Sequence, residues 1–177
     1  MAKTSTSSTS QSARFRRIDL VGAREVWQGG EERSDWSIPG IASDVAAVMD
    51  AERIERAGLI GHSIGGGVVL YAARSLEDRV CGVMGAMRAM MEAGATLELA
   101  KSLQIPIATI NAPDSLINRD LAADAGIEVR TMGRGGHFVM LEDPSGFNQI
   151  VGDLLRAMFW SGSRGINSSA SAIATLP

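Results

Sequence analysis

Three segments of this sequence carry side chains that could together perform nucleophilic catalysis. Ser63 lies in the motif Gly61-His62-Ser63-Ile64-Gly65, His137 follows a glycine-rich stretch, and Asp114 follows an apolar run. A serine hydroxyl is a weak nucleophile until a neighbouring base accepts its proton, and a carboxylate can hold that base in the correct tautomer. We therefore take Ser63 as the candidate nucleophile, His137 as the base and Asp114 as the orienting acid.

The G-x-S-x-G motif stands between two apolar segments, residues 57–60 before it and residues 64–76 after it. A tight strand-to-helix turn exposes its serine but crowds the positions two before and two after it, and glycine relieves that crowding. The helix that follows would direct its first backbone N–H groups at the same point. The N–H of Ile64 is the predicted oxyanion donor. The alternative is a glycine-rich turn with a solvated serine.

The base has only two candidates, because the chain contains two histidines. His62 is excluded because adjacent side chains in a turn point apart. The glycine-rich residues 133–136 would let His137 lie over the end of a sheet, within reach of the serine. A histidine in an ordinary surface loop is the alternative.

The acid is less well determined by the sequence. Asp114 follows the apolar residues 107–110, but Asp120 and Asp124 are also close in sequence. An aspartate after a strand is often a turn or cap residue. Asp114 is the preferred candidate, and the other two remain open.

Strand-like and helix-like patterns alternate along the chain and would position these residues. Strands are predicted at residues 16–21, 57–61, 80–84, 105–110 and 128–132, and helices at 38–53, 64–76, 87–103, 117–125 and from 144 onward. This alternation predicts an α/β fold with three α/β/α layers and a mostly parallel sheet of about five strands. Sites in such folds lie beyond the carboxyl ends of the strands.

The two ends of the chain differ from its middle. Residues 1–13 are rich in Ser and Thr, and residues 161–177 are rich in Ser, Ala and Gly. Both segments are predicted to be flexible tails. The single domain is then expected to span residues 14–160. The first tail and the arginines that follow it also have the composition of an organelle transit peptide, which is the alternative interpretation.

Composition excludes several classes of protein. The 177 residues are 45% hydrophobic and 21% charged with a net charge of -3, which is typical of a globular domain and does not favour a nucleic-acid partner. No apolar run is long enough for a membrane span. The single cysteine, Cys81, cannot form an internal disulfide, so a reducing, cytoplasmic location is expected. One cysteine and two histidines do not suffice for a structural zinc site.

Taken together, residues 15–158 resemble the α/β-hydrolases. GHSIGGGVVLYAARSLEDRV (61–80) is similar to the nucleophile elbow and its helix in that family. GGHFVMLEDPSGFN (135–148) resembles the histidine loop and final helix of lipase/esterase-like members, and residues 110–118 resemble the segment that carries the acid. The order Ser, Asp, His also agrees. The resemblance implies a cofactor-free, carboxylesterase-like serine hydrolase that cleaves small-molecule esters or related acyl bonds through an acyl-enzyme.

The chain departs from that family in length. We expect the N-terminal strands to be absent, including one that the family places between the strands matching 16–21 and 57–61, and we expect no cap domain. The loop after that strand supplies a second oxyanion donor, for which Gly22 or Ala23 could substitute. Losing one donor costs about 10² to 10³ in rate, so slow hydrolysis of small, activated esters is expected. The sheet must either close the gap or expose an edge to a second copy of the chain, giving a homodimer.

A second class of function remains open. The missing strands favour a catalytically inactive, hydrolase-like domain that serves as a binding or oligomerisation module. An acyltransferase or perhydrolase using the same three residues differs only in which nucleophile accepts the acyl group, and the sequence does not separate it from a hydrolase.

Overall fold

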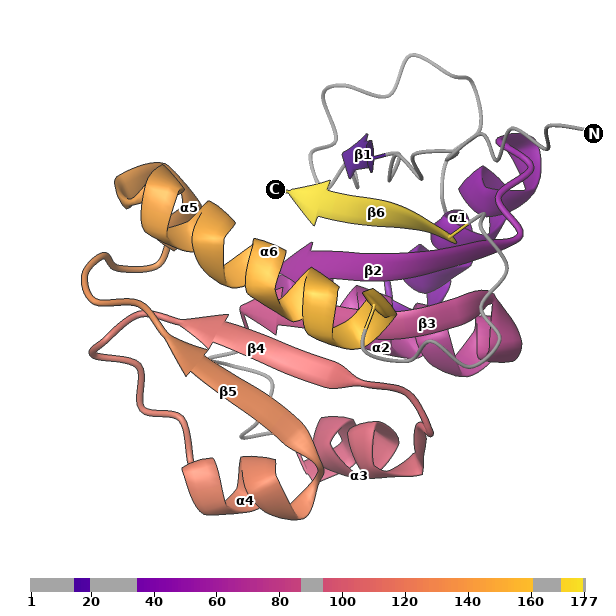
Figure 1. Ribbon diagram of the computed structural model, residues 1–177. Coiled ribbons are helices and arrows are strands. Elements are labelled where there is room, and N and C mark those ends of the chain that lie inside the picture. The colour runs from indigo at the N-terminus through magenta and orange to yellow at the C-terminus, as the bar shows by residue number, and fades with distance from the viewer. Residues whose placement is uncertain (1–14, 20–34, 87–93, 161–169, 177) are drawn as a thin grey trace, which may run out of the picture.

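The computed structural model describes residues 15–19, 35–86, 94–160 and 170–176, which form a parallel sheet between two layers of helices (Figure 1). In these ranges the strands are β1 (Phe15–Asp19), β2 (Arg56–His62), β3 (Val80–Ala86), β4 (Ile107–Asn111), β5 (Ile127–Thr131) and β6 (Ala170–Leu176). The helices are α1 (Ile38–Ala51), α2 (Ile64–Leu76), α3 (Gly94–Ser102), α4 (Arg119–Asp124), α5 (Val139–Glu142) and α6 (Pro144–Trp160).

The strands lie in the order β1-β6-β2-β3-β4-β5, and every neighbouring pair is parallel. The predicted α/β class and parallel sheet are therefore confirmed. The sheet contains one strand more than the five expected, because β6 was not predicted.

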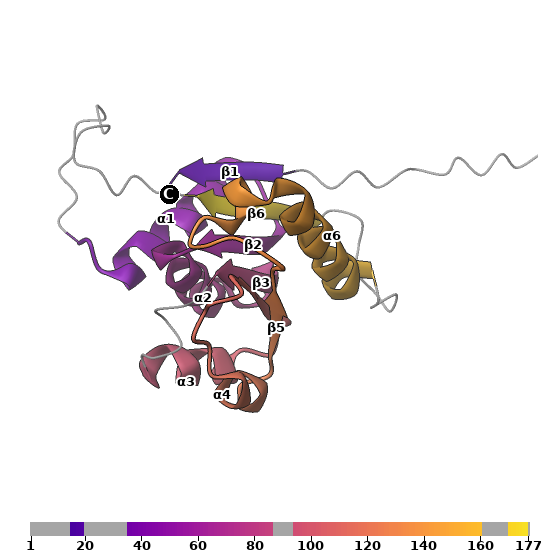
Figure 2. The same ribbon diagram turned by 90° about the vertical axis from the view of Figure 1, so that its left-hand side faces the viewer.

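Helices lie on both faces of the sheet, as expected for three layers (Figure 2). An apolar cluster packs on each face. Side chains of a strand alternate between faces. Leu59 of β2 accordingly joins the cluster formed with α1 and α2, while its neighbour Ile60 packs on the other face. There α6 contributes the fully buried Leu154. The apolar period in residues 147–158 thus marks the face by which the last helix attaches to the sheet.

The predicted flexible tail at residues 161–177 is wrong for residues 170–176. They form β6, which lies between β1 and β2, with Ala172 opposite Phe15 on one side and Gly58 on the other. The segment carries few large apolar residues, so its sequence gave little hydrophobic signal, but a central strand also gains backbone hydrogen bonds on both sides.

The position of β6 also answers the question of the missing strand. The sheet neither closes directly across the gap nor leaves β2 as an edge, because a segment from the far end of the chain fills that place. Pairing with a second copy of the chain stays a prediction. The strands without a second neighbour in the described sheet are β1 and β5.

The predicted helices that are described from their first residue begin at or within two residues of their expected positions, whereas several helices end one or two residues earlier than predicted. Ser37 caps α1, its hydroxyl accepting a hydrogen bond from the N–H of Gly40 at 3.1 Å, and Pro39 lies in the first turn. The helix predicted at 87–103 is described only over α3, since residues 87–93 fall outside the described ranges, as does the predicted tail at 1–13. No helix among the described residues is long and apolar enough to cross a membrane.

Candidate active site

Ser63 occupies the turn between β2 and α2 in a strained conformation. Its backbone has φ 53° and ψ -122°, a region that costs a non-glycine residue free energy. Gly61 permits this turn, because a Cβ on that residue would lie 2.1 Å from the carbonyl oxygen of Gly65. The N–H of Gly66 donates to the Ser63 carbonyl at 3.0 Å. Gly61 therefore allows the chain to turn sharply, as the motif predicts.

The turn presents polar groups at the carboxyl end of the sheet. Ser63 is half-buried, and Ile64, the first residue of α2, has a side chain that is 62% exposed. The N–H groups in the first turn of a helix have no partner within that helix, and the helix dipole is positive there. The backbone N–H of Ile64 thus belongs to the part of the molecule best suited to stabilise a developing negative charge.

His137 is brought to the same turn through its neighbour His62. The Nε2 atom of His62 lies 2.8 Å from the carbonyl oxygen of His137, and the two imidazole rings have centroids 4.7 Å apart. The ring of Phe138 lies against both imidazoles, at 5.3 Å and 4.9 Å. Residues that are 75 apart in sequence therefore meet directly beside Ser63.

The loop that carries His137 is held by the acidic residues that follow it. The carboxylate of Glu142 accepts hydrogen bonds from the N–H of Gly136 at 2.9 Å and of Phe138 at 3.3 Å. Sequence reasoning missed this role of Glu142. The signal was available, because a glutamate shortly after a glycine-rich stretch can turn back onto the exposed N–H groups of that stretch.

Asp143 also holds the loop that carries His137. Its carboxylate pairs with Arg134 at 3.3 Å and accepts a hydrogen bond from the N–H of Gly146 in the first turn of α6 at 3.2 Å. The hydrogen bond from Arg134, followed by the one from Gly146, lowers the pKa of Asp143. The histidine loop is thus tied to the start of the last helix.

The candidate acid is not joined to the candidate base. Asp114 is exposed, and in the described part of the chain no hydrogen bond links it to His137, nor His137 to the hydroxyl of Ser63. The two alternative acids, Asp120 and Asp124, have different surroundings from Asp114. Asp120 is exposed in the first turn of α4, and Asp124 forms an ion pair with Lys101 at 2.7 Å that lowers its pKa.

Several further features bear on the function of this rim, the carboxyl end of the sheet that carries Ser63 and His137. Gly22 and Ala23, the suggested sources of a second oxyanion donor, lie outside the described residues. Large apolar side chains follow the two candidate catalytic residues: Ile64, Phe138 and Leu141 are 62%, 44% and 73% exposed. Exposed apolar side chains beside a polar site can contact an apolar part of a ligand.

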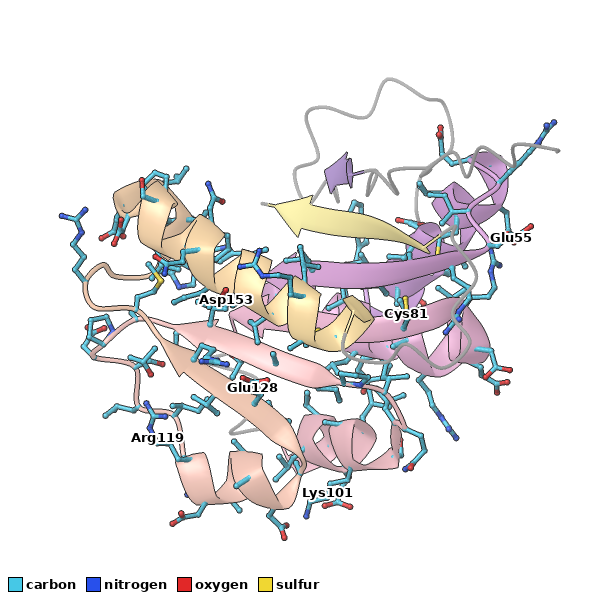
Figure 3. All side chains as sticks on the ribbon, viewed as in Figure 1. Glu55, Cys81, Lys101, Arg119, Glu128 and Asp153 are labelled. Atoms are coloured by element: carbon cyan, nitrogen blue, oxygen red, sulfur yellow. The ribbon has the colours of Figure 1, made fainter. Side chains whose placement is uncertain are left out.

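Cys81 is remote from this rim. Figure 3 places it near the start of β3, at the end of the sheet away from the strand arrowheads. It is buried, and burial raises the pKa of its thiol, which disfavours the reactive thiolate. Within the described ranges, no group of three or more His, Cys, Asp or Glu side chains could hold a metal ion.

Solved structures of α/β-hydrolases are similar to this chain. A predicted CIB-like hydrolase from Thermoplasma acidophilum matches with a TM-score of 0.59 and 19% identity over 69% of this chain and 61% of its own. The N-acyl homoserine lactonase AidH matches with a TM-score of 0.59 and 15% identity, over 70% of this chain and 72% of its own. A meta-cleavage product hydrolase from Pseudomonas fluorescens matches with a TM-score of 0.57 and 16% identity, over 72% of this chain and 75% of its own.

These matches establish the fold. Over about 70% of its length the chain has part of the α/β-hydrolase fold, and it spans only about three fifths of the Thermoplasma protein. No protein-family model matches the sequence. What the chain does must therefore be argued from its own residues.

Proposed function

We propose that this protein is a serine hydrolase that cleaves small, activated esters through an acyl-enzyme intermediate. Ser63 is the nucleophile, His137 the general base, and the backbone N–H of Ile64 one oxyanion donor. Asp114 is the proposed orienting acid, and it must approach His137 through movement of the segment after β4. The hydrolase fold of the structural relatives agrees with this chemistry and does not choose the substrate.

One observation carries the proposal. A serine held at positive φ between a strand and a helix is followed by helix N–H groups, and the loop of His137 is bonded to the residue just before that serine. A nucleophile elbow needs such a turn, together with an accessible hydroxyl, a base that can reach it and a backbone donor for the oxyanion, and the turn and the nearby histidine loop support the proposal. The strain at Ser63 has a use if the hydroxyl must be presented to a substrate.

In the proposed reaction, His137 takes the proton of the Ser63 hydroxyl as its oxygen attacks the ester carbonyl. The resulting oxyanion accepts a hydrogen bond from Ile64, and His137 returns the proton to the leaving alcohol. Water then repeats the sequence and releases the acid. The exposed apolar side chains of Ile64 and Phe138 favour a substrate with an apolar acyl group.

A fluorophosphonate probe tests the proposal directly, because it phosphonylates only a serine that is activated as a nucleophile. We expect the wild type to be labelled at Ser63, Ser63→Ala to lose the label, and Ser102→Ala, a change in an exposed helical serine, to keep it. Hydrolysis of 4-nitrophenyl acetate should follow the same order. A folded wild type that reacts at no serine would contradict the proposal.

A second candidate function is a hydrolase-like domain without activity that binds a partner. The open arrangement favours it, since within the described residues the hydroxyl of Ser63, the imidazole of His137 and the carboxylate of Asp114 are not hydrogen-bonded to one another. Asp114→Asn separates the two functions. An enzyme loses at least tenfold in rate when its orienting carboxylate is neutralised, whereas a binding module has no rate to lose. If labelling occurs, added alcohols or peroxide distinguish acyl transfer from hydrolysis.

A further inference from the structure

The imidazole of His62 takes no part in the proposed proton transfer, yet it is a buried polar group at this rim. The residue is 5% exposed, and its Nε2 lies 2.8 Å from the carbonyl oxygen of His137. A carbonyl oxygen can only accept a hydrogen bond, so Nε2 must carry the proton. The other ring nitrogen, Nδ1, is buried and has no hydrogen-bond partner among the residues that the structure describes. The geometry therefore requires one form of this side chain, the Nε2–H tautomer.

The electrostatics of the site agree with a neutral ring. Burial lowers the pKa of His62, and the charge of the nearby His137 lowers it further, against the opposing effect of the hydrogen bond to the His137 carbonyl. The lowered pKa favours the neutral ring, which can donate through Nε2.

The hydrogen bond joins the two halves of the candidate site. His62 is the last residue of β2, opposite Ala86 of β3, and so stands on a central part of the sheet. The histidine loop is held at its N–H groups by Glu142, on both sides of His137, and at the carbonyl of His137 by His62. The peptide groups around the base are therefore fixed from two directions, one of them the residue preceding the candidate nucleophile.

We propose that His62 is a positioning residue, whose Nε2–H holds the backbone of His137 so that the base stays beside Ser63. This rests on the proposed roles of Ser63 and His137. The competing explanation is that the ring is only an aromatic filler, packed against His137 and Phe138. The two explanations differ in what they require of residue 62: a donor at the ε position, or a flat ring.

Two substitutions separate these explanations. His62→Gln keeps an N–H donor at about the position of Nε2 and removes the ring, whereas His62→Phe keeps the ring and removes the donor. Misplacing a catalytic group by about 1 Å can cost about 100-fold in rate. We expect His62→Phe to lower the rate of fluorophosphonate labelling at Ser63 by about 30-fold, and His62→Gln to retain it within about threefold. Amide exchange at residues 136–138 should quicken in His62→Phe only.

A measurement on the wild type decides the tautomer without any need for activity. The chain has only two histidines, so long-range ¹H–¹⁵N spectra contain four ring nitrogens, and the spectrum of His62→Gln identifies those of His62. We expect a protonated Nε2 and an unprotonated Nδ1 at neutral pH. The opposite tautomer overturns the proposal even if His62→Phe does not fold.

The other outcomes are equally decisive. Equal labelling of His62→Phe and the wild type, or an equal loss in both variants, shows that the donor does not position the base. A wild type that is never labelled refutes the proposed hydrolase, and the tautomer and the amide exchange of residues 136–138 still decide whether His62 holds the loop.

Discussion

A Cβ placed on Gly61 would lie 2.1 Å from the carbonyl oxygen of Gly65, closer than two such atoms can approach. The contact is between backbone groups, which cannot move aside as the end of a flexible side chain can. The sharp turn at Ser63 is therefore incompatible with any side chain at position 61. Glycine at this position is required by packing, whatever the chemistry of the serine.

Gly61→Ala should consequently destabilise the protein by at least about 3 kcal/mol, because the turn and the start of α2 must shift to accept the methyl group. Gly133→Ala is the matched control, since a Cβ there meets nothing within 4 Å. Urea unfolding of both variants gives the comparison. Similar free energies of unfolding for the two would show that the turn is looser than described.

Glu142→Ala should loosen the histidine loop. The variant leaves the N–H groups of Gly136 and Phe138 without their carboxylate acceptor, and such charge-assisted hydrogen bonds are stronger than neutral ones. We expect hydrogen exchange at both amides to become at least tenfold faster, with a loss of stability of about 1–2 kcal/mol. Glu98→Ala, an exposed glutamate of α3, is the control and should alter neither amide.

Asp143 combines two functions that substitutions can separate. Asp143→Asn removes the charge that pairs with Arg134 but keeps an oxygen able to cap α6 through the N–H of Gly146, whereas Asp143→Ala removes both. Solvent screens the exposed ion pair, so it should contribute little to stability, whereas the cap satisfies an N–H that has no partner within the helix. Thermal unfolding should therefore rank the asparagine variant between the wild type and the alanine variant. Identical melting temperatures for Asp143→Asn and Asp143→Ala would argue against a role of residue 143 in capping α6.

Burial of His62 makes stability depend on pH. Because the pKa of His62 is lowered below the ordinary value of 6.5, the unfolded chain binds a proton more readily than the folded protein as the pH falls. The free energy of unfolding should decrease from about pH 6.5 downward, until the folded pKa is reached. The slope contributed by this residue is at most about 1.4 kcal/mol per pH unit.

His62→Gln provides the control for that titration. The variant lacks the ionisable ring, so its stability between pH 7.5 and 5 should change less than that of the wild type. Parallel curves for the two proteins would mean that His62 is no more difficult to protonate in the folded state than in the unfolded one.

The elements that the sequence predicted well are those with strong local signals. The helix at 64–76 has its predicted ends, because a glycine-rich turn and an apolar face mark its start and extent. The position of His137 after the last predicted strand and before the last helix was also evident. Local patterning thus placed the serine and the histidine at one end of the sheet.

What the sequence missed depends on pairing between distant residues. β6 consists mainly of small residues, and only its neighbours β1 and β2 give it a place in the sheet. The contact of His62 with the His137 carbonyl spans 75 positions, and no periodicity reports such a contact. The sequence excluded His62 as the base, and it offered no signal for the hydrogen bond between His62 and the His137 carbonyl.

Ala172→Pro tests the placement of β6. Residue 172 lies opposite both Phe15 and Gly58, and proline removes an N–H from a strand that is paired on both sides. We expect a loss of about 3 kcal/mol or more, and self-association on gel filtration if β2 becomes an exposed edge. Ala172→Ser keeps the N–H and should change stability by less than about 1 kcal/mol. A proline variant that is as stable as the serine variant and elutes at the same volume would contradict the described sheet.

The arrangement of β1, β6 and β2 also has a consequence for synthesis. β1 pairs only with β6 in the described sheet, so β1 must wait for a strand that is made more than a hundred residues later. During translation, residues 15–19 have no partner, and β2 exposes the side that β6 will cover. Contacts so distant in sequence slow folding and leave strand edges open to other chains. The nascent chain should therefore depend on chaperones until residues 170–176 have been made.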